Sequence, residues 1–231
     1  RIAVAMLAIP LLAVGWLVGS EGGFRLLCAG LTRLTDSRLQ IEAPVGRLLG
    51  DWHAQSVSWL DASQEVELQQ LQVNWSPRGL LHGQVEITRI EAASLRVDAP
   101  PSSEATTLPE SLELPLPVRI AHLALGKLLF GEHGEDPTVL AEGVEAELKS
   151  DGQTYSIDRL QAQFGQLEIA GEAPLAASAP YGLNAHASLK GRALDQSFTL
   201  ELRGSGPLAQ IQVEGRIVAV AKVSGALRAV L

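Results

Sequence analysis

The chain has 231 residues and a formal net charge of −8, from 18 Lys and Arg against 26 Asp and Glu. Its basic residues are scattered and form no run, which argues against a nucleic-acid partner. The single cysteine, Cys28, excludes an intrachain disulfide and any multi-cysteine metal site. Hydrophobic residues make up 46% of the chain but aromatic residues only 4%. A buried or sheltered surface must therefore be lined mainly by Leu, Ile, Val and Ala.

The first predicted element is an apolar segment over residues 2–18, uncharged and broken only by Pro10 and Gly15. Seventeen residues of helix span roughly 25 Å, slightly less than the bilayer core of about 30 Å. Because the chain begins with Arg1, we expect upstream residues to lengthen the span. A cleaved signal peptide has the same pattern, but no clear A-x-A site follows. Residues 1–20 are therefore predicted to be a retained membrane anchor with a cytoplasmic N-terminus. The residues predicted to lie in the membrane are Ile2, Val4, Leu7, Ile9, Leu11, Leu12, Val14, Trp16, Leu17 and Val18.

Residues 21–40 are predicted to form a short helix and a connector. Glu21-Gly22-Gly23 breaks the first helix, and over residues 24–34 the apolar side chains recur at helical spacing. This stripe consists of Phe24, Leu27, Cys28 and Leu31, with Arg25 and Arg33 outside it. The helix would either lie on a membrane or plug the end of the β body; alternatively, it would cap a core. Three nearby tryptophans would sit at a lipid interface or pack on this helix: Trp52, Trp59 and Trp75.

Short segments of alternating apolar and polar residues follow, and we group residues 41–98 as a first β segment. Val66 and Leu68 have one parity, whereas Leu71 and Val73 have the other. This slip at Gln69-Gln70 predicts a β-bulge or a strand that changes faces. Residues 99–117 are rich in Pro, Ser, Thr and Glu, and we predict a flexible loop without secondary structure.

Residues 118–231 repeat the alternating pattern and form a second β segment, which we expect to continue beyond the chain. Asp151-Gly152 is a tight-hairpin signal, and Gly- or Pro-bearing turns separate the later strands. This spacing is typical of antiparallel meanders without long crossover connections. Strand-turn-strand units of this kind stack into an elongated sheet.

One apolar row per strand is predicted to line a shared surface. Its residues are Val85, Ile87, Val97, Val144, Leu148, Leu160, Phe164, Leu167, Ile169, Leu183, Leu189, Phe198, Leu200, Leu202, Ile211 and Val213. Alternation alone does not distinguish an open groove from a sandwich in which two sheets bury these residues against each other. The scarcity of aromatic bulk and the absence of Greek-key connections favour the open groove.

The sequence contains no recognisable set of catalytic or metal-binding residues. The five histidines (His53, His82, His122, His133 and His186) lie far apart on different predicted elements. Three acidic residues, Glu132, Glu135 and Asp136, share one charged turn, for which solvation is the simplest explanation. Gly204-Ser205-Gly206 is no nucleophile elbow, because no helix follows it. We therefore expect no enzyme activity, no cofactor and no metal.

Several segments together carry a resemblance to a known family. They are Gly46-Arg-Leu-Leu-Gly50, the alternating residues 66–75, Trp75-Ser-Pro-Arg-Gly-Leu-Leu81, Val85-Glu-Ile87 and Leu95-Arg-Val-Asp98. In this order, after an apolar segment and a short helix, they resemble the N-terminal portion of the TamB family. The chain is similar more broadly to the AsmA-like proteins, whose β units form a repeating groove.

The resemblance implies a mainly β protein: a transmembrane helix and a short amphipathic helix, then an elongated antiparallel sheet curled into an open hydrophobic groove, or β-taco. It implies an inner-membrane, single-pass protein whose β body lies in the periplasm. The implied function is conduction of phospholipid acyl chains between the two membranes within a translocation and assembly module. The implied partner is TamA, an Omp85-type outer-membrane barrel, bound through a C-terminal region outside this chain. The alternative is a chaperone-like scaffold for nascent outer-membrane proteins, without lipid conduction.

Overall fold

A computed structural model describes residues 16, 18–61, 65–99, 111–132, 136–193, 196–208, 210–219 and 224–230. Of the predicted membrane anchor, Trp16 and Val18 are within these ranges, and the other anchor residues lie outside them. Among the described residues no helix has both the length and the apolar character needed to cross a bilayer. The predicted flexible loop is described from Ser111 to Pro117, and its residues 100–110 lie outside the described part.

Helix α2, Glu21–Leu34, confirms the predicted short helix. The Ser20 side chain caps it by accepting a hydrogen bond from the Gly23 amide at 3.0 Å. Phe24 and Cys28 are buried, as the apolar stripe predicts, but Leu31 remains 46% exposed. The buried residues of α2 thus lie in its first two turns. The apolar stripe continues toward the C-terminus of the helix, where it is not buried.

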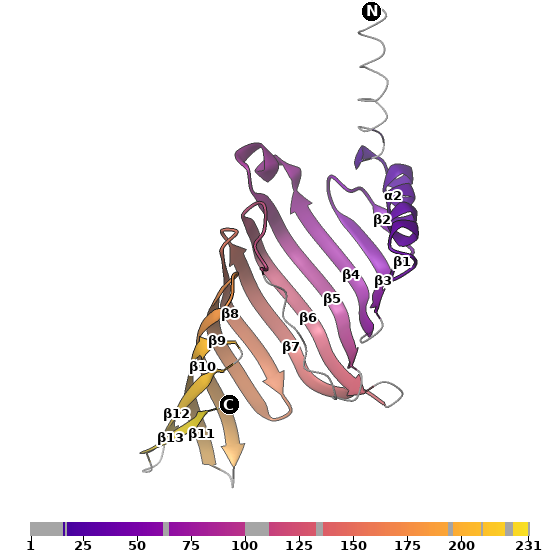
Figure 1. Ribbon diagram of the computed structural model, residues 1–231. Helices are drawn as coiled ribbons and strands as arrows, with labels where there is room; N and C mark the ends of the chain where they lie inside the picture. The colour runs from indigo at the N-terminus through magenta and orange to yellow at the C-terminus, as the bar shows by residue number, and fades with distance from the viewer. Residues whose placement is uncertain are drawn as a thin grey trace, which may run out of the picture.

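The rest of the described chain forms one thirteen-stranded sheet (Figure 1). Its strands follow one another in sequence order, except that β1 pairs with β3 and β2 pairs with β3 off the main path. The strands are β1 Leu39–Glu42, β2 Val45–Gly46, β3 Trp52–Leu60, β4 Glu65–Ser76, β5 Val85–Ala99, β6 Val118–Glu132, β7 Thr138–Ser150, β8 Thr154–Phe164, β9 Leu167–Ala176, β10 Gly182–Ala193, β11 Gln196–Pro207, β12 Gln212–Ala219 and β13 Ser224–Val230. A 3-10 helix, η1 Pro77–His82, joins β4 to β5.

One strand pair departs from the predicted meander. β5 and β6 pair in parallel, with Val85 beside Val118 and Val97 beside Phe130. Parallel neighbours need a crossover connection between them, whereas antiparallel neighbours can be joined by a tight hairpin. The prediction of an antiparallel sheet without long crossovers is therefore wrong at this pair, and the sheet is largely antiparallel.

Residues in left-handed conformation interrupt several strands. Gln70 has φ of 53°, which confirms the irregularity predicted at Gln69-Gln70. Gly143 in β7 and Arg159 in β8 have φ of 58° and 50°, and the pairings beside both are shifted. Such irregularities add a residue and increase local twist, so the apolar side chains keep one face while the sheet bends.

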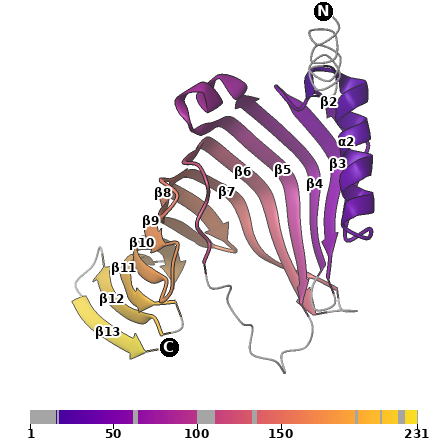
Figure 2. The ribbon, with the colours of Figure 1, turned by 45° about the horizontal axis from the view of Figure 1, so that its top comes forward.

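The sheet is a single curved layer, and α2 is the helix that lies beside its first strands (Figure 2). Among the described residues, the Leu, Ile and Val side chains that are buried are those of Leu71 and Val73, both on β4. Other large apolar side chains, such as Phe130 and Ile217, are exposed. A second sheet packed on the first would bury them, so the two-sheet alternative does not hold for the described residues.

Candidate functional site

Strand register brings the apolar residues of successive strands into continuous rows across the sheet. Side chains of directly paired residues share one face. Leu160 lies beside Gly171, which lies beside Ala187, which in turn lies beside Leu202. A parallel row is Ala162, Ile169, Leu189, Leu200 and Ile217. We call the face that carries these rows the aliphatic face.

The same face continues over the N-terminal strands. One row consists of Trp75, Ile87, Ile120, Leu148 and Ile157, from β4 to β8. Another consists of Trp59, Val66, Val97 and Phe130. The parallel β5–β6 pair keeps these rows in register, because partners in a parallel ladder also point to the same side.

The residues predicted from sequence to line a shared surface, Ile211 apart, stand at register positions of this face. That they line a shared groove stays a prediction. Along β9 and β10 the burial alternates, with the apolar positions partly sheltered and their neighbours exposed. Phe164 is 39% exposed, so even an aromatic residue of the row is accessible. Ile211 stands just before β12, and its Cγ2 would lie 3.6 Å from a Cβ placed on Gly204.

The opposite face is polar and carries ion pairs. Lys149 and Asp158 lie 2.5 Å apart, and Arg159 and Glu147 lie 2.8 Å apart. Hydrogen bonds from Lys149 and Ser156 hold the pKa of Asp158 below its ordinary value. The sheet is therefore amphipathic: one face is charged and the other aliphatic.

Helix α2 covers the aliphatic face at its first strands. The rings of Phe24 and Trp52 lie 5.5 Å apart at a tilt of 50°. This contact supports the prediction that Trp52 packs on the helix, whereas Trp75 donates its indole N–H to the Leu48 carbonyl at 2.7 Å. Trp59 is exposed.

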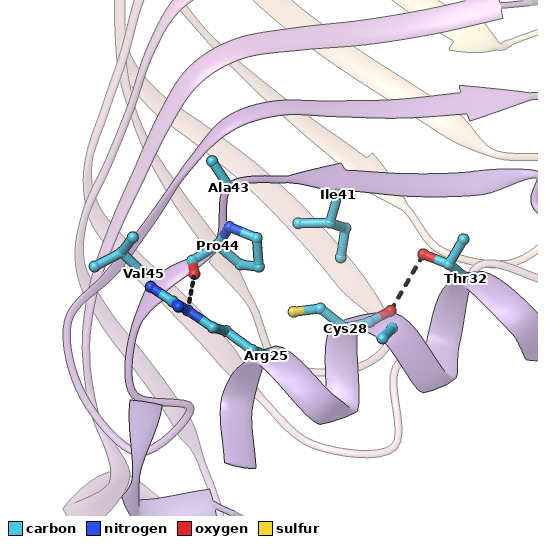
Figure 3. A pocket seen from close by; sticks show the side chains of 8 residues that line it. Arg25, Cys28, Thr32, Ile41, Ala43, Pro44 and Val45 are labelled. Carbon is cyan, nitrogen blue, oxygen red and sulfur yellow. Dashed lines mark hydrogen bonds between the residues drawn. The ribbon is translucent and has the colours of Figure 1, made fainter. Parts of the chain in front are cut away.

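A cavity of about 470 Å³ remains between α2 and β1–β2, lined among others by Cys28, Ile41 and Val45 (Figure 3). Arg25 donates to the Pro44 carbonyl at 3.3 Å at one side of this cavity. Burial raises the pKa of the Cys28 thiol, which keeps the thiol protonated and therefore a poor nucleophile.

An ordered segment, residues 111–117, lies at the strand ends beside the β7–β8 turn and the end of β9, within a stretch for which the sequence predicts a loop without secondary structure. The Leu112 amide donates to the Ala177 carbonyl at 2.8 Å, and the Leu114 amide to the Gly152 carbonyl at 3.1 Å. The Tyr155 hydroxyl donates to the Leu112 carbonyl. We call residues 111–117 the edge strap. Its signal in the sequence is the alternation Leu112-Glu-Leu114-Pro-Leu116, which the surrounding prolines conceal.

Within the described part of the chain, no three His, Cys, Asp or Glu side chains gather as a metal site would require. His53, His82, His122 and His186 are on β3, η1, β6 and β10, and His122 lies 4.0 Å from Glu91. His133 is outside the described residues. What the described residues offer to a ligand is the aliphatic face, a surface suited to contact with apolar groups.

Comparison with known proteins gives one match. The family model for the N-terminal domain of TamB matches residues 10–131, just over half of the chain. No curated protein and no solved structure matches it.

Proposed function

The chain belongs to the TamB family, and we propose that its aliphatic face shields phospholipid acyl chains on their way between the inner and outer membranes. Membership of the family implies a role in the translocation and assembly module. The proposal adds lipid conduction, anchorage in the inner membrane by residues 2–18, and a periplasmic position of the sheet. TamA is then the outer-membrane partner.

The observation that carries the proposal is an aliphatic face that, beyond the first strands under α2, has no covering layer among the described residues. A soluble domain normally buries such a face against a second layer of structure. Here the rows from Trp75 to Ile157 and from Ala162 to Ile217 remain partly accessible. Large exposed apolar surfaces mark binding sites for apolar partners.

The energetics suit an acyl chain. Exposing sixteen methylene-sized groups to water costs roughly 12 kcal/mol, at about 0.8 kcal/mol for each group. Contact with the aliphatic face removes much of this cost. Because neighbouring rows present similar Leu, Ile, Val and Ala side chains, the free energy changes little as a chain moves from row to row. A charged headgroup stays in water at the open side.

Site-specific photocrosslinking tests the proposal. A photoreactive amino acid replaces Leu200 on the aliphatic face or, as a matched control, its neighbour Glu201 on the polar face. We expect phospholipid adducts at position 200 and severalfold fewer at position 201. Leu200→Arg in a protein labelled at Leu189, its neighbour in the row, should reduce the adducts while folding persists.

Adducts to outer-membrane polypeptides at position 200, with no lipid, would reject conduction in favour of the chaperone-like scaffold. Such a scaffold would present the sheet to nascent strands. Equal lipid yields at positions 200 and 201 would reject both the conduit and the distinction between the two faces.

A further inference from the structure

We propose that the end of the sheet where β4 passes into η1 rests on the bilayer. In this arrangement η1 inserts into the bilayer surface. The proposal rests on the proposed function, because the bilayer in question is the one that residues 2–18 would anchor in. It goes further, because it gives a second membrane contact and fixes the orientation of the sheet. The occupant of this surface is a lipid bilayer with anionic headgroups.

The first support is a pair of exposed leucines in η1. Leu81 in η1 is 85% exposed, and Leu80 beside it is also exposed. The helix is held from its other side, since Gly79 is buried and a Cβ there would lie 2.9 Å from the Gln84 carbonyl oxygen. η1 therefore presents leucines outward from a fixed base. Exposure of this kind opposes solubility unless the leucines have an apolar partner.

The second support is that apolar residues from three other segments lie at the same end of the strands as η1. Trp16 is 56% exposed, and Leu49 is exposed and donates its amide to the Val18 carbonyl at 3.1 Å. The indole of Trp75, at the end of β4, donates to the neighbouring Leu48 carbonyl. These two bonds connect the end of the apolar N-terminal segment to the turn before β3 and then to the strand that leads into η1.

We call the exposed residues Trp16, Leu49, Leu80 and Leu81 the apolar edge. In Figure 1 the start of α2, the turn before β3 and the short helix joining β4 to β5 all lie at the upper end of the sheet. An amphipathic tryptophan suits the interface between acyl chains and headgroups.

Charges beside the apolar edge favour anionic headgroups. Arg47 and Arg78 are exposed and flank the leucines in sequence, and the exposed acidic neighbours are Asp51 and Glu21. Glu21 is paired with Arg25 at 2.6 Å and Glu86 accepts from Gln84, so their charges are partly engaged. Basic residues close to an anionic membrane surface are attracted to it, and the attraction falls off within a Debye length.

The opposite end of the strands supplies a matched control. Leu60 ends β3, far along the strand from Trp52, and is 47% exposed. It is an exposed leucine like Leu81, although less exposed (47% against 85%), and it lies at the other end of the strands. If exposure alone caused membrane contact, both leucines would make it.

The experiment uses the full chain reconstituted in liposomes of phosphatidylethanolamine and phosphatidylglycerol. Cys28→Ala leaves no other thiol, and Leu81→Cys or Leu60→Cys then carries an environment-sensitive fluorophore. Quenching is measured with iodide from the aqueous side and with a nitroxide-labelled phospholipid from the bilayer. If η1 lies at interfacial depth, nitroxide quenching at position 81 should exceed that at position 60 about fivefold, with iodide quenching reversed.

Three outcomes decide the matter. Position 81 quenched by nitroxide and protected from iodide supports the proposal, and Arg78→Glu should then weaken nitroxide quenching in liposomes that contain phosphatidylglycerol. Chains that float with the liposomes but leave position 81 open to iodide overturn this inference and leave the proposed anchor standing. Chains that do not float overturn both.

Discussion

Leu167 and Phe198 belong to strands that do not pair, yet the side chains of both lie over Gly191 of the strand between them. A Cβ on Gly191 would lie 2.4 Å from Leu167 Cδ2 and 2.9 Å from Phe198 Cζ. Gly191 is paired with Phe198, so all three lie on the aliphatic face. The missing side chain lets its two neighbours cover the strand and keeps the row continuous.

Gly191→Ala should therefore destabilise β9–β11. The added methyl group displaces Leu167 or Phe198, and overpacking of this kind costs about 1–3 kcal/mol. Hydrogen exchange of the Leu189 and Leu200 amides would report the loss. Gly182→Ala is the control, because a Cβ at Gly182 has nothing within 4 Å. Equal exchange in the two variants would contradict the packing described for Gly191.

Phe24→Ala should release α2 from the sheet. Phe24 is buried against Trp52, and removal of a buried Phe costs about 3–5 kcal/mol. We expect faster amide exchange throughout α2 and a red-shifted tryptophan emission. Leu34→Ala, at a residue that is 83% exposed, should change neither. An α2 that keeps its protection in Phe24→Ala would mean that other contacts hold the helix.

Lys149→Met should raise the pKa of Asp158 toward its ordinary value. Lys149 is the largest cause of the lowered pKa, followed by the hydrogen bond from Ser156. Because the folded pKa lies below the unfolded one, this carboxylate stabilises the fold fully above the unfolded pKa, and the contribution is lost as pH falls through the folded value. NMR titration of the Asp158 side chain measures the shift. Lys190→Met is the control and should leave that titration unchanged.

Tyr155→Phe should loosen the edge strap. The variant removes the hydroxyl that donates to the Leu112 carbonyl, and a net hydrogen bond contributes about 0.5–1.5 kcal/mol, or up to roughly tenfold in local opening. The Leu114 amide, bonded to Gly152, should exchange faster. The Ala177 amide, which donates to the Gln153 carbonyl at 2.7 Å, should be unaffected. Unchanged exchange at Leu114 would show that the strap does not depend on Tyr155.

Local patterns in the sequence predicted much of this architecture. The parity change between Leu68 and Leu71 indicated an irregular strand, and Gln70 has the left-handed φ that produces it. Asp151-Gly152 indicated a hairpin, and Asp151 Oδ1 accepts from the Gln153 and Thr154 amides in the turn between β7 and β8. These two bonds also lower the pKa of Asp151. Each such feature is decided within a few residues, so composition and spacing suffice.

Long-range pairing could not be predicted in the same way. Val85 lies beside Val118 in a parallel ladder, but the alternating pattern of a strand is identical whichever direction its neighbour runs. The edge strap was missed for a related reason. Its backbone bonds go to Gly152 and Ala177, distant residues that its own composition does not reveal. The sequence likewise did not determine which surface α2 covers. The contact between Phe24 and Trp52 in the structure identifies that surface.

Because the strands follow one another in a single layer, each strand is stabilised mainly by its two neighbours, and this limits how far local unfolding spreads. The extensive contacts between described strands join neighbours in the sheet, so stability is a sum over adjacent pairs, as in stacked repeats. Damage at β11 should leave β3–β5 intact, and heating should melt the molecule in stages instead of at one midpoint. The edge strap adds a cross-link to this series. Through Gly152 and Ala177 it ties the segment leading into β6 to turns beyond β7 and β9, so those strands should melt together.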